Sequence, residues 1–270
     1  MNDAVRFSHQ PSGGIAVKLE NLLALAALVL AFAAALFALA PGPVYAAGVL
    51  ELLPAFALLL DWAPGAAIAA GCLGLLALAV AARRRRWRAA TGAVAACLLG
   101  GVVWLSVVDF KARAAANPLH DVTTDLDAPP LFQAISPRSY RAGGEDTMAA
   151  YPDATWRRTH AEIYPDIRPV IVSGSMSEVL AHTRSIAGRM GWTIVAEEGD
   201  AALMRIEASD ETAWFGFTDD IVVVLRIVVP PGDAESGVRV DVRYVSRIGI
   251  GDVGKNADRV RAFLGRLSSG

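Results

Sequence analysis

Residues 21–40 read NLLALAALVLAFAAALFALA, a run of twenty residues without a charge. At about 1.5 Å of rise per residue, a helix of this length covers roughly 30 Å, the thickness of the hydrocarbon core of a bilayer. Two further uncharged runs follow at residues 66–82 and 90–108. We therefore predict three transmembrane helices in an N-terminal anchor that spans residues 1–108.

The segment between the first two runs, residues 44–60, is apolar but contains Glu51 and Pro54 and is followed by Asp61. Charges are unfavourable at the centre of a bilayer, and proline interrupts a helix. We therefore interpret this segment as an interfacial or re-entrant helix, or as a kinked extension of the second span. A fourth span is the remaining alternative, and it would reverse the side on which the rest of the chain lies.

Five arginines, Arg83–Arg86 and Arg88, separate the second run from the third. Because basic loops stay in the cytoplasm, three spans place the N-terminus inside and the residues after 108 outside. In a bacterium this predicts a multi-pass protein of the inner membrane with a periplasmic C-terminal domain. The third run carries Gly92, Ala96 and Gly100, a spacing that permits close helix packing in a compact bundle or in a homo-oligomer.

The composition agrees with an anchor joined to a water-soluble domain. Hydrophobic residues make up 54% of the chain and charged residues 19%, below the roughly 25% of a soluble domain. A disordered chain, a fully soluble protein and a basic nucleic-acid binder are disfavoured. Both cysteines, Cys72 and Cys97, fall inside the apolar runs, so we expect no disulfide and no Cys-type zinc site in the C-terminal part. No metal or other cofactor is expected.

The C-terminal part divides into a proline-rich strap, residues 109–167, and a patterned domain, residues 168–270. A capping box, Ser175 to Glu178, opens a helix predicted over residues 176–190, and Gly191 ends it. We also predict a short helix at 147–151, strands at 169–173, 192–198, 201–208, 214–217, 221–229 and 238–246, and a final helix, capped by Asn256, at 256–267. This pattern predicts a two-layer α+β domain, an antiparallel sheet with two helices on one face.

Three sequence blocks carry a family resemblance: residues 117–125 (NPLHDVTTD), 217–220 (FTDD) and 246–249 (SRIG), followed by Asp252, Gly254, Asn256 and Arg259. In order and spacing they resemble the domain-of-unknown-function family fourteen ninety-nine over roughly residues 115–267. The resemblance implies a bacterial envelope protein, and it implies no particular activity. Many members carry cysteines in the first block, and this sequence has none there, so no role of those cysteines transfers.

The loop of residues 246–256, SRIGIGDVGKN, is the most distinctive segment. It ends at a predicted helix N-terminus, where free N–H groups favour an anion, and basic side chains could add charge-assisted bonds. The alternative is that Arg247 pairs with a nearby aspartate and locks the turn. The candidate binding residues are Ser246, Arg247, Gly249, Asp252, Gly254, Lys255, Asn256 and Arg259.

Four further residues are secondary candidates: His120, Asp121, Asp219 and Asp220. Adjacent residues of a strand point to opposite faces, so the two aspartates Asp219 and Asp220 are poorly placed to share a metal or a proton. His120 and Asp121 could serve a hydrolase, but neither a GxSxG elbow nor an HExxH motif is present. We assign no catalytic residue.

We therefore expect a noncatalytic protein of the inner membrane whose periplasmic domain binds an anionic or amphiphilic ligand, lipid-like in character, or an envelope partner protein. Two alternatives stay open. One is an envelope hydrolase that uses His120 and nearby carboxylates, and the other is a structural docking protein of a membrane complex. The lipid bilayer is an expected partner, a homo-oligomer through the third span is possible, and nucleic acid is not expected.

Overall fold

The computed structural model describes residues 18–136, 154–228, 237–249 and 251–268. It divides into two compact units, which are described separately. One consists of residues 1–39 and 56–107, and the other of residues 40–55 and 108–270.

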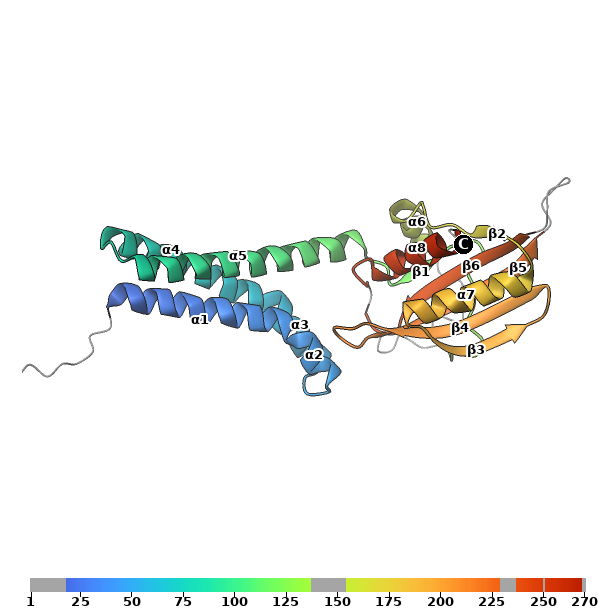
Figure 1. The fold of residues 1–270 in the computed structure, drawn as a ribbon, viewed down its shortest axis with the longest axis horizontal. Helices are drawn as coiled ribbons and strands as arrows, with labels where there is room; N and C mark the ends of the chain where they lie inside the picture. Colours follow the sequence, from blue (N-terminus) through green and yellow to red (C-terminus); the bar gives the residue numbers. More distant parts are fainter. Residues whose placement is uncertain (1–17, 137–153, 229–236, 250, 269–270) are drawn as a thin grey trace, which may run out of the picture. The chain divides into compact units, whose positions relative to one another are not determined.

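Within the described residues, three helical segments are long and apolar enough to cross a membrane (Figure 1). They are helix α1 (Leu19–Leu39), the helical run Leu52–Arg83, and helix α5 (Trp87–Ala116). Their existence confirms the three predicted apolar helices. The second and third are longer than predicted, since they extend to Leu52 and to Ala116.

The segment at residues 44–60 is not one helix. A short helix α2 (Pro41–Ala46) comes first, and the second membrane-length run then begins at Leu52 with helix α3 (Leu52–Ala57), a π-helical turn η1 (Leu58–Trp62) and helix α4 (Ala63–Arg83). The kinked extension of the second span is therefore the alternative that fits residues 52–60. Pro64 cannot donate a backbone hydrogen bond, and the π-turn immediately before it is the kind of local rearrangement that accommodates this loss.

Small residues bring the membrane-length helices close together. A Cβ atom added at Gly100 of α5 would lie 2.9 Å from the backbone oxygen of Ala67, and one at Gly74 of α4 would lie 2.6 Å from Cys97 Sγ. The small residues of the third span therefore pack inside the bundle of this chain. Assembly of several copies through that span stays a prediction.

Among the described residues of the second unit, six strands form one antiparallel sheet. The strand order is β1-β6-β5-β4-β3, and β2 pairs with the other half of β6. The strands are β1 (Asp121–Thr123), β2 (Val170–Ser173), β3 (Thr193–Gly199), β4 (Leu203–Glu211), β5 (Thr218–Val228) and β6 (Gly237–Ser246). After residue 120 the described helices are α6 (Ala154–Ile163), α7 (Met176–Met190) and α8 (Lys255–Ser268).

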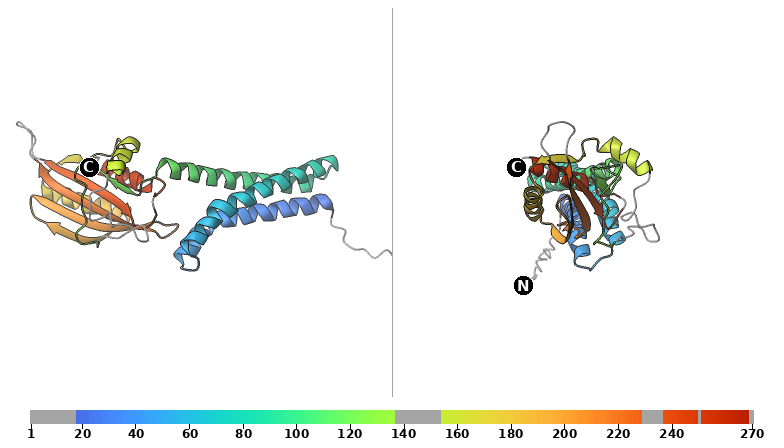
Figure 2. Two further views of the ribbon diagram at one scale, coloured as in Figure 1. Left: turned by 180° about the vertical axis from the view of Figure 1, so that it is seen from behind. Right: turned by 90° about the vertical axis from the view of Figure 1, so that its right-hand side faces the viewer.

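Helices α7 and α8 cover one face of the sheet, as the period-two pattern of the strands predicts (Figure 2). Val223, Val240 and Phe263 are fully buried in this core. The predicted capping box of α7 is present, and Gly191 ends this helix in the left-handed region at φ 81°. The predicted α+β class is confirmed.

Three local predictions differ from the structure. Residues 214–217 form a turn rather than a strand, because Gly216 takes a positive φ of 66° and the Phe217 N–H bonds to Thr212 Oγ1. Strand β1 and helix α6 lie where an irregular strap was predicted. The predicted helix at 147–151 lies outside the described residues.

The second face of the sheet is covered by irregular chain. Residues 124–136, which follow β1 and which we call the cover segment, lie across this face. Phe132 and Ile135 pack there against Val222, Val224 and Val245. The polar face predicted for β6 is therefore largely enclosed.

Candidate functional site

In the loop of residues 246–256, where an anion was expected to bind, the carboxylate of Asp252 bonds to the backbone N–H groups. Asp252 accepts hydrogen bonds from the backbone N–H groups of Gly254 (2.8 Å) and Asn256 (2.5 Å) at the start of α8. Asp252, rather than the predicted Asn256, therefore caps this helix. Burial raises the pKa of Asp252 to about 6. The N–H groups that were expected to hold a ligand are occupied by this carboxyl group.

The arginines of the same loop are paired with carboxylates. Arg247 binds both oxygens of Asp220 at 2.8 and 2.6 Å. Arg259 of α8 pairs with Asp219 and, at 3.1 Å, with Asp210. The two pairs lie on opposite faces of the sheet, as the alternation of strand residues predicts. This geometry agrees with the alternative in which Arg247 locks the turn, and anion binding at the loop stays a prediction.

The remaining loop residues serve packing and hydrogen bonding. Asn256 Nδ2 donates to the backbone oxygen of His120 (2.9 Å) and to Ser246 Oγ (3.0 Å). Gly254 takes φ 82°, and an added Cβ would lie 2.9 Å from the side chain of Asn117. Gly249 takes φ 92°, and Lys255 is exposed at the first position of α8.

His120 and Asp121 do not form a common reactive centre. The His120 ring, which is 5% exposed, lies with Nδ1 3.1 Å from the backbone oxygen of Ser246. Asp121 binds the fully buried guanidinium of Arg243 at 2.9 and 2.7 Å. The second aspartate of this block, Asp125, pairs with Arg239 at 2.6 Å. These side chains join β1 and the cover segment to β6, so the geometry gives each a structural partner.

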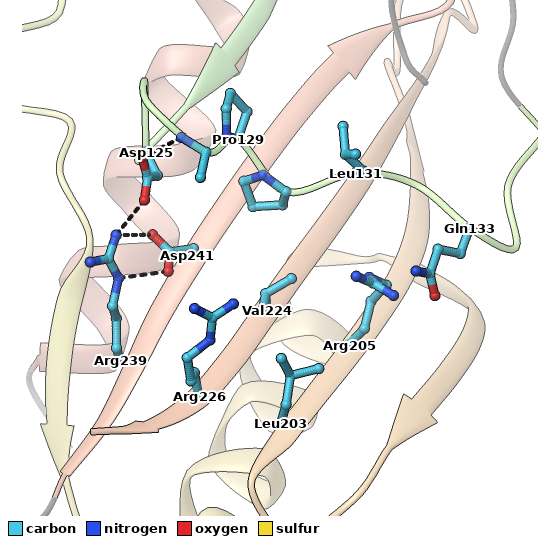
Figure 3. Close-up of a pocket in the computed structure, with 12 residues that line it drawn as sticks. Asp125, Pro129, Leu131, Gln133, Leu203, Arg205, Val224, Arg226, Arg239 and Asp241 are labelled. Carbon is cyan, nitrogen blue, oxygen red and sulfur yellow. Dashed lines mark hydrogen bonds and ion pairs between the residues drawn. The ribbon is translucent and has the colours of Figure 1, made fainter. Parts of the chain in front are cut away.

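A pocket lies elsewhere, between the cover segment and the sheet (Figure 3). Its volume is about 250 Å³. We call it the arginine pocket because Arg205, Arg226 and Arg239 stand on its sheet side. Its lining consists of Asp125, Ala128, Pro129, Pro130, Leu131, Gln133, Leu203, Arg205, Val224, Arg226, Arg239 and Asp241.

Strand register brings the three arginines together. Arg226 of β5 lies opposite Arg239 of β6 and opposite Leu203 of β4. One step along the same face, Arg205 of β4 lies opposite Val224. Directly opposed residues of antiparallel strands share a face, so these side chains line one floor.

The arginines of the pocket differ in their partners. Arg239 binds Asp241 at 2.8 and 3.1 Å and Asp125 at 2.6 Å, and the bond to Asp241 is the main cause that raises the pKa of Arg239. Within the described part of the chain, neither Arg205 nor Arg226 forms an ion pair.

For Arg205 the described structure leaves one donor without an acceptor. Its Nε is buried and lacks a hydrogen-bond partner there, although Glu198 is its cross-strand neighbour on β3. A buried donor without an acceptor is unfavourable, so this atom is suited to receive a ligand oxygen.

Glu207 fixes the roof of the pocket. Its buried carboxylate accepts backbone N–H bonds from Gln133 (2.6 Å), Ala134 (3.0 Å) and Ile135 (2.7 Å). Three successive N–H groups directed at one carboxylate hold the cover segment against β4. Gln133, which lines the pocket, is held in this way, and the lining residue Leu131 lies two positions before it.

Sequence analysis did not single out Arg205 and Arg226. The signal available was the alternation of β4 and β5, which places basic residues on the face away from the helices. That pattern is typical of a solvated sheet face. Only the cover segment, whose path has no sequence period, turns this face into a pocket.

Fold and site together define a membrane-anchored, two-layer α+β protein with a cationic pocket on the sheet face away from its helices. The model of the family described as protein of unknown function (DUF1499) matches residues 121–267, more than half of the chain. The chain therefore belongs to this family, and the resemblance noted in the sequence is confirmed. No curated protein and no solved structure matches the chain.

Proposed function

We propose that the chain is a noncatalytic protein of the bacterial inner membrane that binds an anionic ligand in the arginine pocket of a periplasmic domain. Three membrane-length helices support the membrane location. The arginines at residues 83–86 and 88 support a cytoplasmic loop between the second and third helices, which leaves the following domain outside.

One observation carries the ligand assignment. Arg226 and Arg239 lie directly opposite each other on adjacent strands, and two like charges in that position are destabilising. Aspartates compensate Arg239, whereas Arg226 has no ion pair within the described residues. A bound anion between Arg226 and Arg205 would neutralise the charge that the fold leaves there.

The proposal is tested by ligand-dependent thermal stability. The full chain, in a nonionic detergent, is unfolded with increasing methyl phosphate at constant ionic strength. A ligand that binds the folded state raises Tm by mass action, so we expect a saturable rise. The double variant Arg205→Gln, Arg226→Gln should lose this rise.

The matched control is Arg266→Gln, which removes one exposed positive charge on α8, outside the pocket. This variant should respond as the wild type does. An equal response of the double variant, or no response of the wild type, would exclude anion binding at the arginine pocket.

A further inference from the structure

The floor of the arginine pocket alternates cationic and apolar side chains. Leu203 and Arg205 share this face of β4, and Val224 and Arg226 share it on β5. Because Leu203 lies opposite Arg226 and Val224 lies opposite Arg205, each unpaired arginine has an apolar neighbour across the strand boundary. A ligand that contacts both arginines therefore also covers aliphatic surface.

The roof of the pocket is poor in hydrogen-bond donors. It includes Ala128, Pro129, Pro130 and Leu131. Proline has no backbone N–H, and the carbonyl oxygen of Pro130 already accepts a bond from Arg243 at 3.2 Å. On this side of the pocket, the hydroxyl oxygens of a sugar would find few N–H donors, which is unfavourable for such a ligand. Methylene groups would meet no such penalty.

The size of the pocket limits how much of a ligand it encloses. Its volume of about 250 Å³ lies just below the usual range of roughly 300–1,000 Å³ for small-molecule sites. Such a space admits a compact charged group and the first part of an attached chain. The remainder of a longer ligand would stay outside.

We infer that the ligand is an anionic amphiphile, whose charged head binds Arg205 and Arg226 and whose first methylenes lie between Leu131 and the floor residues Leu203 and Val224. This inference rests on the proposed function, since it names the ligand class of the same pocket. It predicts that affinity grows with aliphatic length, provided that both arginines are present.

The test compares methyl phosphate with hexyl phosphate, which share a head group and differ by five methylenes. Dissociation constants are measured by titration calorimetry on the full chain in a nonionic detergent. At about 0.8 kcal/mol per buried methylene, burial of two or more should tighten binding at least about tenfold. Leu131→Ser should reduce this advantage and leave methyl phosphate binding within about twofold.

The outcomes separate the two proposals. Equal affinities for the two phosphates in the wild type would overturn the amphiphile inference and leave anion binding intact. A chain-length effect that persists in the double variant Arg205→Gln, Arg226→Gln would indicate partition into detergent or protein surface, and it would also overturn the inference. If the wild type does not bind methyl phosphate at all, the proposed function itself is excluded.

Discussion

Arg243 is fully buried, and its guanidinium donates to both carboxylate oxygens of Asp121. Removal of one partner from a buried ion pair leaves the other charge uncompensated, which typically destabilises by about 3–5 kcal/mol. We expect Arg243→Ala to lower the free energy of unfolding by this amount, measured by denaturant titration. The matched control is Arg226→Ala, which removes a positive charge from the same sheet face.

Arg226→Ala should change stability by less than about 1 kcal/mol, and the direction should be favourable, because it removes one of the two like charges that lie opposite each other at Arg226 and Arg239. Its effect should fall on ligand binding instead. Comparable losses of stability in the two variants would contradict this assignment of a structural and a binding arginine.

His160 is a single residue that should make the stability of the fold depend on pH. Its ring is fully buried on α6, Nε2 accepts the Thr123 N–H at 3.2 Å, and burial lowers the pKa of His160 to about 4. The unfolded chain takes up this proton near pH 6.5, so the contribution is present above that pH and is lost as pH falls towards 4. The full shift corresponds to roughly 3 kcal/mol.

The measurement is urea unfolding of the wild type and of His160→Gln at pH 7, 5.5 and 4.5. Glutamine keeps an acceptor for the Thr123 N–H and does not titrate. The free energy of unfolding of the variant should therefore fall less between pH 7 and 4.5 than that of the wild type. The carboxylates common to both proteins cancel in the comparison. Parallel pH profiles would show that His160 is not the group responsible.

Among the elements, the cover segment depends most on a single side chain. The Glu207 carboxylate holds three of its N–H groups, and hydrogen bonds to a charged group contribute about 1.5–3 kcal/mol. Glu207→Gln replaces one acceptor oxygen by a donor, so we expect a loss of about 2 kcal/mol. Amide hydrogen exchange at residues 131–136 should accelerate selectively, while that of α7 is unchanged.

The control for this variant is Glu198→Gln, an exposed glutamate on the neighbouring strand β3. It makes the same chemical change, and within the described residues no hydrogen bond or ion pair joins Glu198 to the cover segment. Uniform acceleration of exchange across the domain in Glu207→Gln would indicate global destabilisation and would contradict the local role.

The helices of the anchor offer an adjacent pair of glycines for a matched test. An added Cβ at Gly100 meets the Ala67 backbone oxygen at 2.9 Å, whereas none of the described atoms lies within 4 Å of one at Gly101. We expect Gly100→Leu to lower the free energy of unfolding by about 1–3 kcal/mol through overpacking. This loss should appear as a lower Tm of the detergent-solubilised chain. Gly101→Leu should be tolerated, and equal effects would contradict close packing of α4 and α5.

Sequence periodicity predicted the elements whose faces differ in polarity. The apolar runs predicted the membrane-length helices, and the capping box at Ser175 fixed the start of α7. Alternation predicted β5 and β6 to within a few residues of their observed ends. These signals are local, so one sequence is enough to read them.

The candidate site was not predictable in the same way. The pocket needs Arg205 and Arg226 on neighbouring strands and Leu131 of a segment far away in sequence. The cover segment is held by Glu207 through backbone N–H groups, and backbone groups carry no sequence signal. The short strand β1 is likewise stabilised by its partner β6 rather than by its own composition.

At the scale of the whole molecule, the orientation in the membrane decides where a ligand could come from. We expect alkaline phosphatase fused after residue 268 to be active in a bacterial host, because this enzyme folds only outside the cytoplasm. A fusion within the arginine loop at residues 84–86 should be inactive. The reverse pattern would place the domain in the cytoplasm.

Strand β1, the first after α5, is hydrogen-bonded to β6, the last of the described strands. A nascent polypeptide therefore cannot complete its sheet before residues up to about 246 have been synthesised. Premature termination anywhere before β6 would leave β1 and β2 without their strand partner and β5 with one unpaired edge, all of them open to proteases. The proteases of the cell should consequently meet either the finished domain or a fragment that they can degrade, with no stable partial product between them.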